Sequence, residues 1–398
     1  MADTVPIRPR RILPVIILSQ FAGTALWFAG NAVIGDLQHE LGVSEAALGY
    51  VTSAVQLGFI VGTLAFAFFA VSDIYSPRIV YFICALAGAA ANAATYALAE
   101  GLVSLLGWRF VTGFFLAGIY PVGMKIASGW YQRDLGNALG FLVGALVLGT
   151  AFPHLLRGLG QALPWQTVLL GVSALAACGG VAMLAFVPDG PHLTRGAKFD
   201  PRALAAIFRE TRFRASAFGY FGHMWELYAF WAFVPVVLAA QISAANAEPL
   251  NVSVWTFSII AAGALGCVAG GLISKRVGSA PVAFTQLLTS GACCAISPLL
   301  FYAPAPIYLA FLLLWGIAVV GDSPQFSALN AANAPRARVG SALTIANCIG
   351  FSITIPSIEL LNWAAPKVGA QWLFLMLLPG PVFGLVALLP LLRGRAPR

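Results

Sequence analysis

The chain of 398 residues is 60% apolar, carries only 9% Asp, Glu, Lys and Arg, and has a formal net charge of +8. A soluble domain is roughly half apolar and about a quarter charged, so this composition excludes a soluble globular protein and indicates a surface that faces lipid. The basic residues are too sparse for a nucleic-acid-binding patch and fall between apolar runs. We therefore interpret the charge as a determinant of membrane orientation and expect a lipid bilayer, and no nucleic acid, as a partner.

Apolar runs of membrane-spanning length recur twelve times along the chain. About 20 helical residues cross the hydrocarbon core, and only a helix satisfies its own backbone groups within one such run. The sequence thus predicts an all-α membrane protein with twelve transmembrane helices, at residues 12–35, 46–70, 79–99, 102–128, 135–158, 164–187, 213–240, 252–274, 281–303, 305–329, 339–362 and 370–392.

The basic residues predict the orientation of these spans. All of the 22 Lys and Arg residues except Arg109, Arg157 and Lys367 lie at the termini or in and beside the loops on the same side. By the positive-inside rule that side is cytoplasmic. We expect a multi-pass protein of the cell (inner) membrane with both termini in the cytoplasm.

A long basic connection at 189–212 divides the spans into six and six. We predict an N-terminal half at 1–188, a cytoplasmic linker at 189–212 and a C-terminal half at 213–398. A weak internal repeat supports this division. Two glycines and a proline recur with the same spacing, Gly-x-x-x-x-Gly-x-x-Pro, at Gly113, Gly118 and Pro121 in the fourth span and at Gly316, Gly321 and Pro324 in the tenth. A repeat displaced by six spans keeps its orientation, so a pseudo-two-fold axis along the membrane normal relates the halves.

Polar side chains gather on every third span. An ionisable group inside the bilayer costs at least roughly 2.5 kcal/mol, so it normally faces a cavity or a partner. We expect the first, fourth, seventh and tenth spans to line a common aqueous path, with the third, sixth, ninth and twelfth spans outside. The predicted substrate-binding residues on this path are Gln20, Trp27, Asn31, Arg109, Tyr120, Tyr220 and Gln325.

Loop motifs give the chain a family resemblance. The segment Phe69-Ala-Val-Ser-Asp73-Ile-Tyr-Ser76-Pro77-Arg78 resembles the Gly-x-x-x-Asp-x-x-Gly-Arg-Arg motif of the Major Facilitator Superfamily, and Gly271-Leu-Ile-Ser-Lys275-Arg-Val-Gly278 resembles its second copy with Lys275 in place of the acid. The resemblance implies a secondary transporter whose two halves rock about a central site. The antiporter motif of the fifth span is poorly matched, so antiport has no support here.

Three titratable residues are candidates for proton coupling: Glu226, His223 and Asp322. A carboxyl that exchanges protons with each side in turn can couple transport to a proton gradient, and His223, one turn away from Glu226, can relay the proton. The alternatives are structural hydrogen bonding for Glu226 and His223, and capping of a turn broken by Pro324 for Asp322.

Arg109 stays charged and must face an anion or another acceptor. Its partner is either an anionic substrate group, one of the acids, or backbone carbonyl oxygens, and the last two would make it a helix-pinning residue. Asp73 with Arg78 indicates a conformational latch at a cytoplasmic helix end, against the alternative of a solvated loop.

The sequence contains no motif for an enzymatic or metal-dependent function. The chain lacks a Gly-x-x-x-x-Gly-Lys-Ser/Thr loop, His223-Met-Trp-Glu226 lacks the second His of a zinc-protease motif, and the cysteines have no metal-binding spacing. We predict no enzyme, no metal and no cofactor. The preferred function is a monomeric, proton-coupled secondary transporter of a small solute, preferably an anion. Alternatives are proton-driven efflux of hydrophobic drug-like compounds, an ion-independent facilitator, and a non-transporting receptor with the same fold.

Overall fold

The structure is a computed structural model that describes residues 9–131, 135–160, 163–193, 206–245, 248–335 and 338–393. Over these residues the chain forms helices and their connections. The N-terminal half consists of α1 (Ile12–Thr24), α2 (Ala29–Ala32), α3 (Ile34–Leu41), α4 (Ala47–Phe68), α5 (Val71–Ile74), α6 (Pro77–Leu98), α7 (Leu102–Leu116), α8 (Tyr120–Trp130), α9 (Leu135–Leu159) and α10 (Gln166–Phe186).

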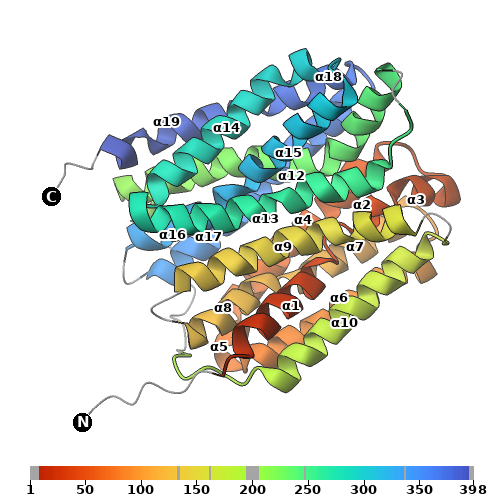
Figure 1. The fold of residues 1–398 in the computed structure, drawn as a ribbon. Helices are drawn as coiled ribbons and strands as arrows, with labels where there is room; N and C mark the ends of the chain where they lie inside the picture. The colour runs from red at the N-terminus through yellow and green to blue at the C-terminus, as the bar shows by residue number, and fades with distance from the viewer. Residues whose placement is uncertain are drawn as a thin grey trace, which may run out of the picture.

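The C-terminal half begins with a long helix and ends in a broken one. Its elements are α12 (Thr211–Ala244), α13 (Val252–Val277), α14 (Ser279–Leu300), α15 (Ala305–Gly321), α16 (Ser323–Asn333), α17 (Val339–Ala364), α18 (Ala370–Leu373), the 3₁₀ helix η2 (Phe374–Leu377) and α19 (Pro379–Arg393). In Figure 1 the N-terminal half, red to yellow, lies below the C-terminal half, green to blue. The predicted limits of the linker stay a prediction, because residues 194–205 lie outside the described residues.

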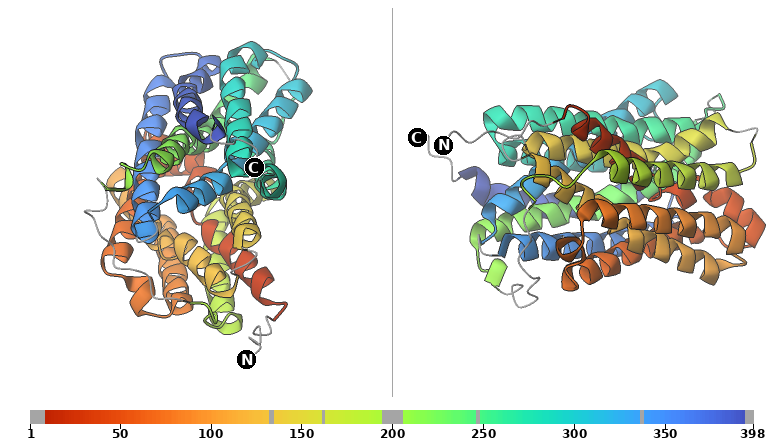
Figure 2. Two further views of the ribbon diagram at one scale, coloured as in Figure 1. Left: turned by 90° about the vertical axis from the view of Figure 1, so that its left-hand side faces the viewer. Right: turned by 90° about the horizontal axis from the view of Figure 1, so that it is seen from below.

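The predicted spans have helical counterparts. Eleven segments of the described chain are long and apolar enough to cross a membrane, with α7 and α8, α15 and α16, and α18 to α19 each counted as one segment, and α1 is a shorter apolar helix. The start of α1 and the end of α19 lie at the same end of the bundle, which we call the terminal end, and the opposite end is the far end (Figure 2). The twelve-helix prediction is confirmed.

The first span is not the single helix that we predicted. It breaks after Thr24, turns through residues 25–28 and resumes as α2 at Ala29. The helical phase is lost at the break, so Gln20, Thr24, Trp27 and Asn31 do not continue along one regular helix face. The prediction of one continuous helix over 12–35 was wrong, because the helix periodicity does not extend across the interruption.

The fourth and tenth spans break at equivalent places. The break between α7 and α8 precedes Pro121, and the break between α15 and α16, at Asp322, precedes Pro324. Proline lacks the backbone N–H and its ring clashes with the preceding turn, so it can kink or interrupt a helix in front of it. The interruption that the sequence predicted at Pro324 is confirmed, and the internal repeat reproduces it at Pro121.

The repeat also governs close helix packing. A side chain at Gly113 would overlap the carbonyl of Val55, and one at Gly316 would overlap the carbonyl of Ile259. Small residues let membrane helices approach to backbone contact. The second span thus packs against the fourth as the eighth packs against the tenth, which is the physical content of the two-fold repeat.

The two halves meet along α9 with α13 and along α4 with α17. The third, sixth, ninth and twelfth spans, α6, α10, α14 and α19, expose large apolar side chains such as Ile83, Val181, Leu299 and Val386. Exposed apolar surface of this kind is what lipid contact requires. The site described next lies between the halves.

Candidate functional site

A cavity of about 40 Å³ lies between the halves. It has room for a few water molecules and is too small for a sugar-sized solute. The N-terminal half contributes α8 and α9 to its wall, and the C-terminal half contributes α12 and α15 to α17. The lining residues are Tyr120, Met124, Val143, Leu146, Tyr220, Met224, Leu227, Tyr228, Val320, Ser323, Ser327, Asn347 and Phe351.

The lining is aromatic, sulfur-containing and hydroxylated, and none of these residues is charged. Of the predicted substrate-binding residues, Tyr120 and Tyr220 line the cavity. The first span contributes no lining residue, whereas α9 and α17 do, so this cavity does not follow the predicted arrangement of the first, fourth, seventh and tenth spans. Gln325 is buried on α16 beside the wall residue Ser323 and is not part of the lining.

Arg109 lies inside the N-terminal half, fully buried on α7. Its Nη2 donates to the carbonyl oxygens of Leu26 (3.1 Å) and Trp27 (2.7 Å), and its Nη1 donates to Oδ1 of Asn92 (2.8 Å). A broken helix leaves carbonyl groups without intrahelical donors, and in a membrane these need another partner. The guanidinium supplies it, so the contacts support the helix-pinning role of Arg109 and the carbonyl partners that the sequence allowed.

Asn92 extends this pin to the outer helices. Its Nδ2 donates to the carbonyl of Leu169 and to Oγ of Ser173 on α10, each at 3.0 Å, while its Oδ1 accepts from Arg109. Gly30 leaves room for the guanidinium, because an added Cβ there would lie 3.1 Å from Arg109 Nε. The interrupted first span is therefore tied through α7 and α6 to α10.

The other polar residues of the first span are held within the N-terminal half. Trp27 Nε1 donates to Gln56 Oε1 (3.2 Å), and Asn31 Nδ2 donates to Thr52 Oγ1 (2.7 Å). The side-chain amide of Gln20 is buried without a hydrogen-bond partner among the described residues and is packed against Gly123. None of the three is among the residues that line the cavity.

An aromatic layer joins the halves next to the cavity. It consists of Trp27, Phe28 and Phe59 from the N-terminal half and Tyr228, Trp231 and Phe351 from the C-terminal half. Ring centroids across the halves are 4.4 Å apart for Phe59 and Phe351 and 5.6 Å apart for Trp27 and both Tyr228 and Phe351. Tyr228 and Phe351 also line the cavity, so this layer closes one of its sides.

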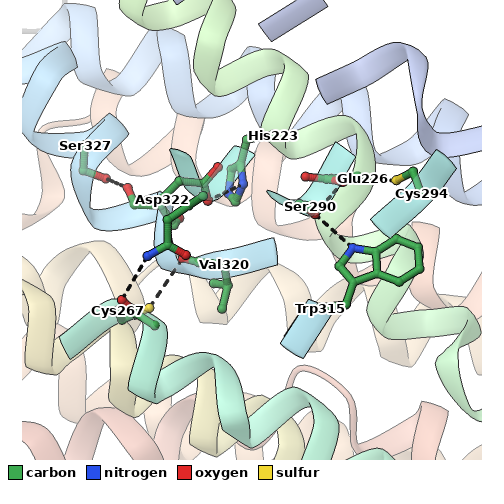
Figure 3. A network of polar contacts seen from close by, with 12 residues as sticks. His223, Glu226, Cys267, Ser290, Cys294, Trp315, Val320, Asp322 and Ser327 are labelled. Carbon is green, nitrogen blue, oxygen red and sulfur yellow. Dashed lines mark hydrogen bonds and ion pairs between the residues drawn. The ribbon is translucent and has the colours of Figure 1, made fainter. Parts of the chain in front are cut away.

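A buried His–Asp pair lies one residue layer behind the cavity wall. His223 Nδ1 is 2.9 Å from Asp322 Oδ1, and both side chains are fully buried. The His223 ring packs between Tyr220 and Phe326, with centroid separations of 6.1 and 5.7 Å. Val320 and Ser323, on either side of Asp322, and Tyr220, one turn before His223, line the cavity. Figure 3 shows the pair at the break between α15 and α16.

Glu226 occupies a different environment, inside the C-terminal half. Its Oε2 accepts hydrogen bonds from Ser290 Oγ (2.9 Å) and Cys294 Sγ (3.5 Å) on α14, and Trp315 Nε1 on α15 donates to the same Ser290 Oγ (2.9 Å; Figure 3). Glu226 is fully buried and is absent from the cavity lining. Of the three predicted coupling residues, the fold brings His223 and Asp322 into direct contact and holds Glu226 apart.

Three hydrogen bonds between described residues join the two halves at the far end; we call them the inter-half clamp. Ser53 Oγ donates to Glu359 Oε1 (2.6 Å), Asn362 Nδ2 donates to the carbonyl of Ala46 (3.0 Å), and Asn251 Nδ2 donates to the carbonyl of Gly158 (2.9 Å). Polar contacts therefore hold the halves together at the far end of the interface.

The comparison with protein families decides what this architecture is. The model of the Major Facilitator Superfamily matches residues 15–357, which is most of the chain. The chain belongs to the Major Facilitator Superfamily. It is accordingly a multi-pass membrane protein of a family of transporters, not of enzymes.

Relatives within the superfamily differ in cargo. A D-galactonate transporter of Escherichia coli O6:H1 strain CFT073 is 28% identical over 162 residues, which is 40% of this chain and only 37% of that relative's length. Among solved structures, the nucleoside transporter NupG has a TM-score of 0.72 with 15% identity, and 95% of this chain and 99% of that one are covered. The human organic anion transporter MFSD10 (TETRAN) has a TM-score of 0.68 with 15% identity over 96% and 100%. At such identities the structures establish the fold.

The superfamily motif in the loop between the second and third spans forms an ion pair, with a partner that sequence reasoning missed. Lys125 Nζ on α8 lies 2.5 Å from Asp73 Oδ1 and also donates to the carbonyl of Ser72. Arg78 instead donates to the carbonyl of Leu184 (3.4 Å), so the two predicted latch residues do not pair with each other. The one sequence indication was the position of Lys125, the sole basic side chain near the end of its predicted span.

Proposed function

We propose that this superfamily member is a proton-coupled transporter of a small, hydroxylated organic anion that works by alternating access in the cell (inner) membrane. The observation that carries the proposal is the buried His223–Asp322 pair behind the cavity wall. In keeping with the basic residues, we place the terminal end in the cytoplasm, and we expect a monomer.

The pair has the chemistry of a proton site. With one shared proton it is neutral overall, and without it a net negative charge remains in an apolar interior. An uncompensated buried charge is costly, so loss of the proton favours any conformation that brings water to the pair. Proton binding is thereby linked to the conformational equilibrium, which is the requirement for coupling. Glu226 is a second, more enclosed candidate in the same half.

The inter-half contacts support alternating access. The clamp holds the halves together at the far end, which we assign to the extracellular side. We interpret this as a state closed to the outside. A rocking motion that opens the far end must break the clamp and separate the rings of the aromatic layer.

The lining supports a hydroxylated cargo. Ser323, Ser327 and Asn347 offer hydroxyl and amide groups, and Tyr120 and Tyr220 offer phenols. A relative transports D-galactonate, a polyhydroxylated carboxylate. Since Arg109 is bound to protein carbonyls and the lining carries no cation, we propose that a co-transported proton, rather than a basic side chain, offsets the negative charge of the cargo. Efflux of a hydrophobic compound is the second candidate, favoured by the Tyr, Phe and Met residues of the wall.

The test is uptake of radiolabelled D-galactonate by proteoliposomes under an imposed pH gradient. We expect the wild type to accumulate it, and Asp322→Asn to lose accumulation while keeping exchange of internal and external D-galactonate. Glu210→Gln, at the exposed beginning of α12, is the control and should behave as the wild type. A hydrophobic dye transported in place of D-galactonate would favour efflux. Uptake indifferent to the gradient would indicate a facilitator, and no transport of any solute a receptor.

A further inference from the structure

Glu226 is held by a hydrogen-bond chain whose direction is fixed by its members. Trp315 Nε1–H can only donate, so it occupies a lone pair of Ser290 Oγ. The Ser290 hydroxyl hydrogen then points to Glu226 Oε2, since no other acceptor for it occurs among the described residues. The Cys294 thiol donates to the same oxygen. Oε2 is therefore the acceptor oxygen of this carboxyl.

The other oxygen, Oε1, is buried without a hydrogen-bond partner in the described part of the chain. The titratable groups around the carboxyl are His223 on its own helix, Cys293 and Cys294 on α14, and Asp322 at the α15–α16 break. His223 is already paired with Asp322, and no Lys or Arg of the described residues forms an ion pair with Glu226. A carboxylate here would be a buried charge with no counter-ion.

We propose that Ser290 and Trp315 are positioning residues that place the proton of Glu226 on Oε1, while burial without a counter-ion keeps this side chain a neutral carboxylic acid. A carboxylic acid has one hydroxyl and one carbonyl oxygen. With Oε2 accepting two hydrogen bonds, Oε2 is the carbonyl and Oε1 the hydroxyl. The proton then has a defined location, on an oxygen whose nearest titratable neighbour along α12 is His223, one turn away.

This inference rests on the proposed function only for its use in transport: Glu226 is the second proton site of the C-terminal half, loaded and oriented before the His223–Asp322 pair changes state. The orientation itself does not depend on any cargo. It can be measured on the full-length protein in lipid without a substrate.

Infrared difference spectroscopy on a pH change or on hydrogen–deuterium exchange tests the orientation through the carbonyl stretch of a protonated carboxyl. We expect a band in the wild type that is absent in Glu226→Gln. Ser290→Ala should move that band to higher wavenumber, because the carbonyl loses a donor, and Ser290→Thr should restore it. Trp315→Phe should move it less, since the serine hydroxyl is kept but no longer directed.

Ser297→Ala is the matched control. Ser297 lies on the same helix, is buried, and bonds only the carbonyl of Cys294 in its own helix, so its loss should leave the band in place. A wild type without a Glu226 band, or a band that Ser290→Ala leaves unmoved, overturns the inference. If the spectra behave as expected and D-galactonate uptake ignores the pH gradient, the proposed function fails and the assignment of the proton to Oε1 stands.

Discussion

The two halves share one internal repeat and differ in what they bury. The N-terminal half buries Arg109, a permanent cation whose donors are bound to the carbonyls of an interrupted helix. The C-terminal half has an uninterrupted α12 at the equivalent place, and it holds Glu226 and Asp322, the two fully buried carboxyls of the described residues. A fixed charge can hold a structure in place, whereas a carboxyl can change charge. We therefore propose a rigid role for the N-terminal half and a proton-responsive role for the C-terminal half.

The difference is not explained by the apolar packing, which the halves have in common. Their second and eighth spans approach the fourth and tenth spans through the same small residues, and both of the latter spans break in front of a proline. Only the polar residues placed on this shared frame distinguish the halves. Substitutions that touch those residues therefore test the comparison most sharply.

The largest expected effect follows from Arg109→Gln. It removes the donors for two helix-break carbonyls and for Asn92, and unsatisfied buried groups cost about 1–3 kcal/mol each in water-soluble proteins and less in membranes. We expect a loss of about 2–3 kcal/mol in unfolding free energy, measured by denaturant unfolding in micelles. Asp322→Asn, whose amide oxygen still accepts from His223, should lose about 1 kcal/mol. Equal losses in both variants would remove the contrast between the halves.

A smaller contrast concerns two tryptophans of the aromatic layer, Trp27 and Trp231. Trp27 Nε1 donates to Gln56, whereas Trp231 Nε1 is buried without a partner in the described structure. Replacing either by Phe keeps an aromatic ring, but only Trp27→Phe leaves a buried acceptor unpaired. We expect it to destabilise the protein by about 1 kcal/mol more than Trp231→Phe does. Thermal unfolding of both variants measures this, and a reversed order would contradict the contacts described.

Backbone conformation gives a third pair of variants, one in each half. Ala70 at the start of α5 has φ = 49° and Gly278 at the end of α13 has φ = 86°. Glycine adopts positive φ readily, whereas other residues are strained there. Ala70→Gly should raise the unfolding free energy by about 0.5–1 kcal/mol, and Gly278→Ala should lower it by about the same amount. Should Ala70→Gly destabilise the protein, its conformation is not strained.

The smallest effect is expected for the ion pair of Asp73 and Lys125, whose side chains are 24% and 22% exposed. Partly exposed pairs contribute about 0.5 kcal/mol and are weakened by salt. We expect Asp73→Asn to change the unfolding free energy by that amount at low ionic strength and to alter the transport rate by a few-fold at most. A loss that persists unchanged at high salt would show that Asp73 acts through something other than charge.

The sequence predicts the frame of this molecule better than its contacts. The spans follow from apolar length, and the break before Pro324 follows from the missing N–H. The interruption of the first span has no proline that would have predicted it. Its free carbonyl groups are satisfied by a cation from another helix, Arg109. His223 lies one helical turn from Glu226, but residues three apart differ by about 60° around the helix, and this lets one face α16 and the other α14.

Partners distant in the sequence account for the rest. The clamp bond between Ser53 and Glu359 and the bonds between Glu226 and Ser290 join residues of unremarkable local pattern. Only the packing of helices brings them together. Of the residues predicted to line the path, Tyr120 and Tyr220 line the cavity. Gln20, Asn31 and Arg109 instead have partners or packing inside their own half.

The central claim is that the His223–Asp322 pair carries the transported proton. Its most direct test is simultaneous measurement of proton and D-galactonate fluxes in proteoliposomes that contain a pH-sensitive dye. For the wild type we predict proton entry that accompanies D-galactonate entry, and for Asp322→Asn we predict continued exchange of D-galactonate with no proton movement. Proton movement coupled to D-galactonate in Asp322→Asn would contradict the account.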